Sequence, residues 1–167
     1  MEDKVDIRKI FEYALQREFE GKRFFEENAL HLKHAAAIDA FKKLAGEEQK
    51  HIEYSNKQNA LLNMGHSPDT ELGETMENAG FFSARASSEM IEQTVSEAMV
   101  ADLPILRMAY LIERDFSEFY QYAAREAEVE AKKVLEMLAL WEHRHELLFK
   151  HMHDTDFEGY ARMPWGG

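Results

Sequence analysis

The stretch WEHRH at residues 141–145 decides how the rest of the sequence is interpreted. Residues three apart on a helix share a face, so Glu142 and His145 can reach one metal ion together. The same Glu-x-x-His pattern occurs earlier, at Glu48 and His51. One such pair is a weak signal in an acidic helical protein. Two copies indicate a repeated site.

A single glutamate precedes each Glu-x-x-His pair at nearly the same distance. Glu18 comes 30 positions before the first pair, and Glu113 comes 29 positions before the second. The residues around these positions also correspond when residues 14–57 are laid over residues 109–152. The matched apolar or small residues are Ala14 with Ala109, Phe25 with Tyr120, Ala29 with Ala124, and Leu44 with Leu138. The chain therefore contains two copies of one helix pair.

Apolar residues at steps of three and four predict four long helices, over residues 6–32, 37–63, 102–127 and 128–153. The short connections within the first and last pairs predict antiparallel packing. Nearly forty residues separate the second helix from the third, enough to run the length of a bundle and to make these two helices parallel. We expect one all-α domain over residues 1–167, a four-helix bundle whose long crossover contains a short accessory helix at about residues 88–101.

Turn and cap residues predict where these helices begin and end. Gly65 is a C-cap for the second helix, and residues 65–87 read as a loop with room for a helical turn near Glu74. Asp102 followed by Pro104 indicates the start of the third helix. Glycines and a proline predict an irregular tail over residues 154–167.

Composition excludes several classes of protein. Lys plus Arg number 20 and Asp plus Glu 32, and the net charge of −12 argues against a general affinity for nucleic acid or anionic membrane. The sequence has no cysteine, so any metal must be held by oxygen and imidazole. No basic region followed by an apolar run opens the chain, and no apolar stretch approaches the length of a spanning helix. We expect a soluble, cytoplasmic protein.

The ionisable residues occupy the middle of the predicted core-facing seams, with hydrocarbon at both ends. Four carboxylates in a bundle core would each cost several kcal/mol by desolvation. Two divalent cations would remove this cost, and oxygen with imidazole suits Fe(II) or Mn(II). Positions left open on paired ions would admit dioxygen or peroxide. The predicted ligands are Glu18, Glu48, His51, Glu113, Glu142 and His145. Tyr120 beside them is a hydrogen-bond donor to a ligand, a redox-active phenol or a core tyrosine.

The ligand pattern resembles the ferritin-like di-iron carboxylate proteins, most closely the rubrerythrin family, over roughly residues 6–153. The resemblance implies a bundle with a di-iron centre, in which iron is the expected metal and manganese or mixed occupancy is an alternative. It also implies reaction with hydrogen peroxide or dioxygen, a part in oxidative stress, and a homodimer. We expect Glu18 and Glu113 to bridge the ions, and the two Glu-x-x-His pairs each to terminate one ion.

The sequence departs from that family in two respects. Rubrerythrins proper carry a rubredoxin domain whose four cysteines hold iron, so a chain without cysteine requires an external electron carrier. The family also has a seventh carboxylate one turn from the third-helix ligand. Tyr110 and Phe116 occupy the positions three before and three after Glu113. Glu47 or a neighbouring subunit would have to supply that group.

Three functions remain open from the sequence. The leading hypothesis is a rubrerythrin-like di-iron oxidoreductase, acting as a peroxidase or ferroxidase. The second is a ferritin-type subunit that oxidises and stores iron in a shell, which the size of the assembly in solution would distinguish. The third is a metal-stabilised bundle without catalysis.

Overall fold

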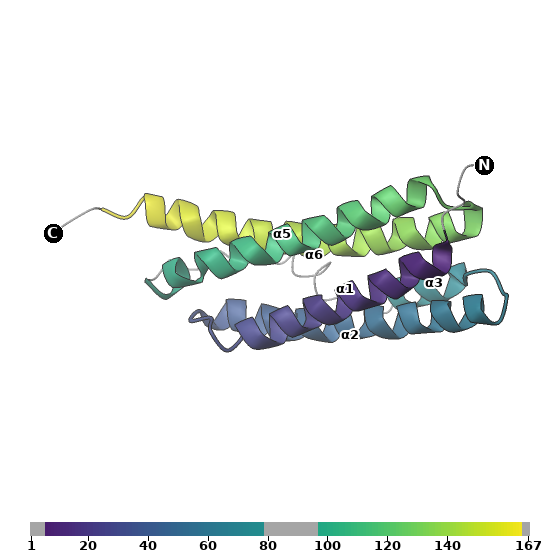
Figure 1. The fold of residues 1–167 in the computed structure, drawn as a ribbon. Helices are drawn as coiled ribbons and strands as arrows, with labels where there is room; N and C mark the ends of the chain where they lie inside the picture. Colours follow the sequence, from purple (N-terminus) through teal and green to yellow (C-terminus); the bar gives the residue numbers. More distant parts are fainter. Residues whose placement is uncertain (1–5, 79–96, 165–167) are drawn as a thin grey trace.

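The computed structural model describes residues 6–78 and 97–164, and every regular element in these two segments is an α-helix. The long helices form two antiparallel pairs, α1 with α2 and α5 with α6, and the pairs lie against each other (Figure 1). The predicted all-α bundle is confirmed. The four long helices are α1 (Ile7–Asn28), α2 (Ala35–Asn63), α5 (Glu97–Arg125) and α6 (Val129–Ala161).

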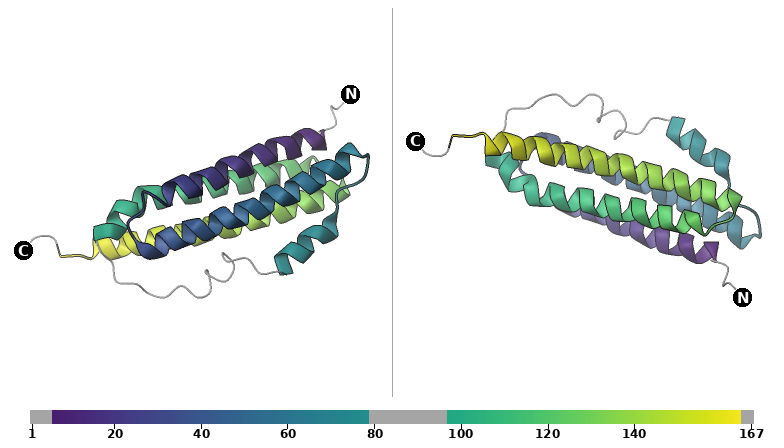
Figure 2. Two further views of the ribbon diagram at one scale, coloured as in Figure 1. Left: turned by 90° about the horizontal axis from the view of Figure 1, so that it is seen from below. Right: turned by 90° about the horizontal axis from the view of Figure 1, so that it is seen from above.

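The connection between the two pairs determines their relative direction. α2 ends at one end of the bundle and α5 begins at the other, so these helices run the same way, as the long crossover predicted (Figure 1). A further helix, α3 (Thr70–Asn78), lies outside the bundle against α6 (Figure 2). Of the accessory helix predicted at 88–101, residues 88–96 lie outside the described residues, and residues 97–101 belong to α5.

The segment after α2 is more ordered than its turn residues predicted. Gly65 follows α2 in the left-handed conformation, with φ of 78°, as expected for a helix end. α3 then forms a helix of nine residues where the sequence predicted a loop with one turn near Glu74. Asp69 caps α3, because its Oδ1 accepts two backbone N–H groups of the first turn at 3.0 and 3.2 Å. Gln58 fixes this corner to α2 through bonds of 2.8 and 2.9 Å with the Asp69 backbone.

Asp102 does not begin a helix, which corrects the sequence prediction. α5 starts at Glu97 and continues through Pro104, which is exposed to solvent. The buried Asp102 carboxylate accepts the backbone N–H groups of Lys33 and His34, each at 2.8 Å. The side chain therefore joins the α1–α2 corner to α5. An aspartate shortly before a proline resembles a helix cap in sequence. Its carboxylate oxygens can instead accept backbone N–H groups from another segment of the chain, as they do here.

α6 extends to Ala161, so the predicted irregular tail is wrong for residues 154–161. Asp154, at the start of this extension, forms an ion pair of 2.5 Å with Lys150 one turn earlier. Asp156, two residues later, is buried. Gly159 is accommodated because a glycine inside a helix costs only about 1 kcal/mol relative to alanine.

Two apolar clusters fill the bundle on either side of its middle. Phe25, Phe41 and Phe149 meet in one cluster, with ring centroids 5.1 to 5.3 Å apart. Tyr54 and Trp141 belong to the other cluster. The buried ionisable residues lie between them, as the seams predicted. Among the described residues, no helix combines the length and the hydrophobicity that a membrane span requires.

Candidate metal centre

The structure brings all six predicted ligand side chains into the middle of the bundle. Every one of them is at most 1% exposed to solvent. Each long helix contributes at the level where its seam changes from hydrocarbon to ionisable groups. The contributors are Glu18 from α1, Glu48 and His51 from α2, Glu113 from α5, and Glu142 and His145 from α6.

The six side chains divide into two overlapping sets, each with one histidine and three carboxylates. In each set the four ligand atoms lie within 4.8 Å of one another. The first set is Glu18, Glu48, His51 and Glu142, and the second is Glu48, Glu113, Glu142 and His145.

This division favours bridging and terminal roles for the four glutamates that are opposite to those expected from the sequence. Glu48 and Glu142 belong to both sets, whereas Glu18 and Glu113 each belong to one. The geometry therefore supports Glu48 and Glu142 as shared carboxylates, and the bridging roles expected for Glu18 and Glu113 do not match it. Helical spacing places each glutamate at a height on its own helix, but it does not reveal which carboxylates meet across the bundle.

Both histidines turn the same ring nitrogen toward the carboxylates. Nδ1 of His51 lies 2.9 Å from Oε1 of Glu142, and Nδ1 of His145 lies 3.1 Å from Oε1 of Glu48. The two rings stack nearly parallel, with centroids 5.3 Å apart and an angle of 9°. Two imidazoles therefore present their Nδ1 atoms to one carboxylate cluster, as two neighbouring metal ions would require.

The metal-free centre balances its charges with protons. Burial acts to lower the pKa of His51, but the carboxylates of Glu142 and Glu48 outweigh it and hold that pKa well above its usual range. Burial raises the pKa of Glu18 and of Glu113 well above the ordinary value for a carboxyl group. Burial also acts to raise the pKa of Glu142, but the His51 charge outweighs it and leaves the pKa below its usual range. In the absence of a cation, protons on these groups would neutralise the cluster.

The donor atoms fit a pair of divalent ions. Six carboxylate oxygens at the centre are buried and make no hydrogen bond of regular geometry with the described residues. Buried carboxylate oxygens left in this state cost several kcal/mol unless a cation faces them. Three carboxylates and an imidazole in each set are the ligand types that suit Fe(II) or Mn(II). The six oxygens are Oε2 of Glu18, Oε1 of Glu113, and both oxygens of Glu48 and of Glu142.

Two further polar side chains touch the ligands. The buried hydroxyl of Tyr120 donates a hydrogen bond to Oε1 of Glu18. Oε2 of Glu47 lies 2.9 Å from Nε2 of His145, on the ring edge facing away from the carboxylates. Glu47 is therefore a hydrogen-bond partner of His145. Glu47 lies off the apolar seam of its helix, so the sequence pattern did not indicate this contact. From the sequence, Glu47 was one of two candidates for the missing seventh carboxylate, the other being a group from a neighbouring subunit.

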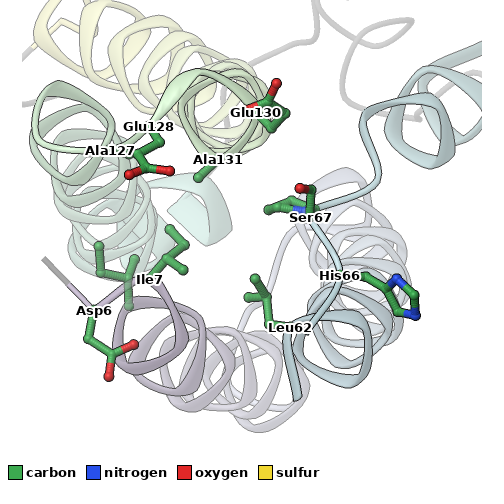
Figure 3. A pocket seen from close by; sticks show the side chains of 11 residues that line it. Asp6, Ile7, Leu62, His66, Ser67, Ala127, Glu128, Glu130 and Ala131 are labelled. Carbon is green, nitrogen blue, oxygen red and sulfur yellow. The ribbon is translucent and has the colours of Figure 1, made fainter. Parts of the chain in front are cut away.

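A separate pocket of about 530 Å³ opens at the end of the bundle where α1 begins (Figure 3). Ile7 and Leu62 form part of its apolar wall, and Asp6 and His66 contribute polar groups. None of the six ligand side chains lines this pocket. It therefore does not belong to the carboxylate centre.

Comparison with known proteins bears directly on this centre. Residues 9–153 match the family model described as Rubrerythrin. No curated protein and no solved structure matches the chain. The matched span includes all six ligand side chains, together with Tyr120 and Glu47.

Proposed function

Since the chain belongs to the rubrerythrin family, we propose that it is a di-iron oxidoreductase that reacts with hydrogen peroxide or dioxygen. One observation carries this proposal: two overlapping sets of three carboxylates and one histidine, buried in the middle of the bundle. Two iron ions, one in each set, would supply two electrons for the reduction of one peroxide to two water molecules. Manganese in either set would use the same ligands.

The ligand residues have distinct tasks in this proposal. Glu48 and Glu142 would contribute to both ions, while Glu18 and Glu113 would each contribute to one. The Tyr120 hydroxyl fixes Oε1 of Glu18 and leaves Oε2 directed toward the first set, 3.3 Å from Nδ1 of His51. Tyr120 thereby orients a ligand carboxylate that would otherwise rotate.

Glu47 performs the corresponding task for His145. As a carboxylate it accepts a hydrogen bond from the Nε2–H group of the ring across 2.9 Å. That proton on Nε2 leaves the Nδ1 lone pair directed at the second set. The charge of Glu47 also makes the imidazole a better electron donor to a bound cation.

The electrons must reach the centre from elsewhere. The sequence has no cysteine, so no thiolate-held iron lies within these 167 residues. A separate electron carrier would re-reduce the centre. We also propose a homodimer and a cytoplasmic location, and both rest on the sequence alone. Native mass measurement tests the assembly, because a ferritin-type shell would be many times larger than a dimer.

Iron analysis combined with rapid mixing tests the proposed function. We expect about two irons per chain after anaerobic reconstitution, since each set offers a full group of ligands. Mixing the di-ferrous protein with peroxide should oxidise the iron faster than peroxide oxidises free Fe(II). An iron content near zero would refute the metal centre. Oxidation no faster than that of free iron would refute the enzymatic function while leaving the centre intact.

Two alanine substitutions test the division into shared and separate ligands. Glu48→Ala removes a carboxylate from both sets, so we expect most of the iron to be lost. Glu18→Ala affects only the first set, so we expect roughly one iron per chain to remain. Equal iron content in the two variants would contradict the shared role of Glu48. Iron content measured with protein concentration decides between these outcomes.

A further inference from the structure

The wall of the bundle is thin where α1 lies beside α5 (Figure 2). α1 packs against α2 far more extensively than against α5. On α1, a Cβ atom at Gly21 would lie 3.5 Å from Oε2 of Glu48, which belongs to both ligand sets. The same Cβ atom would lie 2.9 Å from Cε2 of Phe116 on α5. The Phe116 ring therefore fills the space that a side chain at position 21 would take, next to a carboxylate of the centre.

A guanidinium covers the face of this ring. Cζ of Arg17 lies 4.5 Å from the centroid of the Phe116 ring and 5.9 Å from that of Tyr13. Phe116 is 2% exposed, whereas Tyr13 is 45% exposed and Arg17 is partly exposed. From solvent inward, the order on this side of the bundle is thus Arg17, Phe116 and Glu48.

Arg17 is held over the ring by stacking alone. Its Nε atom is buried and makes no hydrogen bond of regular geometry with the described residues. Arg114 shows the contrast, because its Nε donates to Oε1 of Glu146 at 2.8 Å. If Arg17 swings outward, water can satisfy its Nε, and the contact given up is a cation–π contact, which is weak at a partly exposed site. The cover over Phe116 can therefore open at low cost.

Two other sides of the centre are closed more firmly. Between α5 and α6, the buried Ser117 hydroxyl donates to the carbonyl of Ala139 at 2.9 Å. Between α2 and α6, Trp141 and Tyr54 pack edge to face, and each is at most 1% exposed. α3 covers that pair, since a Cβ atom at Gly73 would lie 3.3 Å from the Tyr54 hydroxyl oxygen. The movable cover is on the α1–α5 side.

We propose that Phe116 and Arg17 form the entrance through which the oxidant reaches the centre, and that Phe116 limits its size. The proposal rests on the proposed function, because it concerns an oxidant that must reach buried ions. Arg17 swings outward, the Phe116 ring turns into the space it leaves, and a gap opens beside Gly21 toward Glu48. Hydrogen peroxide and dioxygen, which have no heavy atoms besides two oxygens, pass this gap. A tertiary alkyl hydroperoxide does not, because its branched carbon is wider than the gap left when one ring turns.

The first experiment measures access in the metal-free protein. Because the chain has no cysteine, Glu48→Cys places a single thiol behind the proposed entrance. Mass spectrometry follows its reaction with methyl methanethiosulfonate. We expect Phe116→Ala to accelerate this labelling at least about tenfold, since it removes the barrier that the ring presents. Arg17→Ala should accelerate it about two- to fivefold, as the loss of one partly exposed cation–π contact implies.

Phe149→Ala is the matched control. It removes an equally buried ring from the apolar cluster at one end of the bundle, and it should cost a similar amount of stability. Labelling through global unfolding would accelerate in both alanine variants, whereas labelling through the entrance accelerates only in Phe116→Ala. Low denaturant should leave the rate in Phe116→Ala nearly unchanged, as expected for local opening. Equal acceleration in both variants, or none in Phe116→Ala, would overturn the entrance.

The second experiment compares two oxidants on the iron-loaded protein. The rates of iron oxidation by tert-butyl hydroperoxide and by hydrogen peroxide are each divided by the rate with free Fe(II). The ratio of these two values should be well below one in the unsubstituted protein, and Phe116→Ala should raise it roughly tenfold or more. Phe149→Ala should leave it unchanged. Equal iron content and helical circular dichroism in all variants show that the centre and fold are intact.

The outcomes separate the two proposals. A ratio near one in the unsubstituted protein, or an unchanged ratio in Phe116→Ala, would overturn the size limit and leave the proposed function standing. If neither peroxide oxidises the iron faster than it oxidises free Fe(II), the proposed function fails. The labelling experiment still decides whether Phe116 and Arg17 form the entrance.

Discussion

At the scale of single residues, the centre depends on which edge of each histidine faces the carboxylates. Nδ1 of His145 points inward, and its Nε2 meets Glu47 on the opposite edge. A ligand imidazole usually gives its second N–H to an acceptor that fixes its tautomer. Glu47 is such an acceptor, although it is not on the core-facing seam of α2. Glu47 and Glu48 are adjacent in sequence, but Glu47 contacts Nε2 of His145 whereas Glu48 belongs to both ligand sets.

Replacing Glu47 with glutamine should therefore weaken metal binding at the second set. Glu47→Gln keeps the size of the side chain but removes the charge that polarises His145, so we expect roughly a 10- to 100-fold lower affinity there. Titration of the metal-free protein with Fe(II) or Mn(II) measures it. Glu53→Gln, an exposed position on the same helix, serves as the matched control. Equal affinities in the two variants would show that Glu47 has no part in the centre.

A substitution at Gly21 tests how closely α1 packs against the ligand residues. A Cβ atom there would lie 2.9 Å from Cε2 of Phe116 and 3.5 Å from Oε2 of Glu48. Phe116 is buried, and the Arg17 guanidinium lies 4.5 Å above its ring, so the ring has little room to move. We expect Gly21→Ala to reduce the free energy of unfolding by about 1–3 kcal/mol, as overpacking does.

Gly46 provides the control for that substitution. It lies inside α2, and a Cβ atom there would meet nothing within 4 Å. Gly46→Ala should therefore stabilise the protein by about 0.5–1 kcal/mol through helix propensity alone. Denaturant unfolding of both variants measures the difference. A stabilised Gly21→Ala variant would mean that Phe116 yields easily and that the close approach is unimportant.

At the scale of elements, one buried side chain joins the two helix pairs near the start of α5. Asp102 reaches from α5 to the backbone of Lys33 and His34, where the chain turns from α1 into α2. The repeated helix pairs are each held together by their own apolar seams. This bond belongs to neither repeat, so no periodic pattern in the sequence could indicate it.

Asp102→Ala should loosen this corner. Two backbone N–H groups would lose a charged acceptor in a buried place, and we expect the free energy of unfolding to fall by about 1–3 kcal/mol. Asp115→Ala, an exposed position on the same helix, should change it by no more than about 0.5 kcal/mol. Hydrogen exchange at residues 33 and 34 should accelerate only in the first variant. Unchanged exchange there would contradict the structural role of Asp102.

At the scale of the whole molecule, the bundle encloses a charged centre that must be neutralised before the helices can close. Without metal, protons on the histidines and on two glutamates do this. With metal, the cations would do it and the protons would leave. The proposed centre would therefore make stability depend on both pH and metal content.

The metal-free protein should lose stability as the pH rises above about 6.5, the ordinary pKa of histidine. Groups whose pKa is higher in the folded state contribute stability that is complete below the unfolded pKa and is lost as the pH rises through the folded pKa. Four groups at the centre have pKa values raised by folding. They are Glu18, Glu113, His51 and His145.

The iron-loaded protein should respond in the opposite direction over the same range. Protons compete with the metal for these ligands, so binding strengthens as the pH rises. The difference in melting temperature between loaded and metal-free protein should therefore widen with pH and disappear on addition of a chelator. Thermal unfolding at several pH values, with and without chelator, measures it. A difference independent of pH would contradict proton exchange at the centre.

The sequence by itself determined the fold class and the cluster of ionisable residues. Helical periodicity is local, so the seams of residues 6–32 and 102–127 could be recognised without knowing what they contact. The spacing of Glu48 with His51, repeated at Glu142 with His145, places each pair on one face of its helix. The energetic cost of burying such charges then indicated a cation.

Only the tertiary structure decided how these groups meet. Lateral distances between helices made Glu48 and Glu142 the shared carboxylates, brought Glu47 onto His145, and stacked Trp141 on His51. Each of these relations joins residues on different helices, separated by about ninety positions or more in the chain. A periodic pattern describes which way a side chain faces from its own helix. The partner it finds depends on how the helices pack, and that is set by the whole bundle at once.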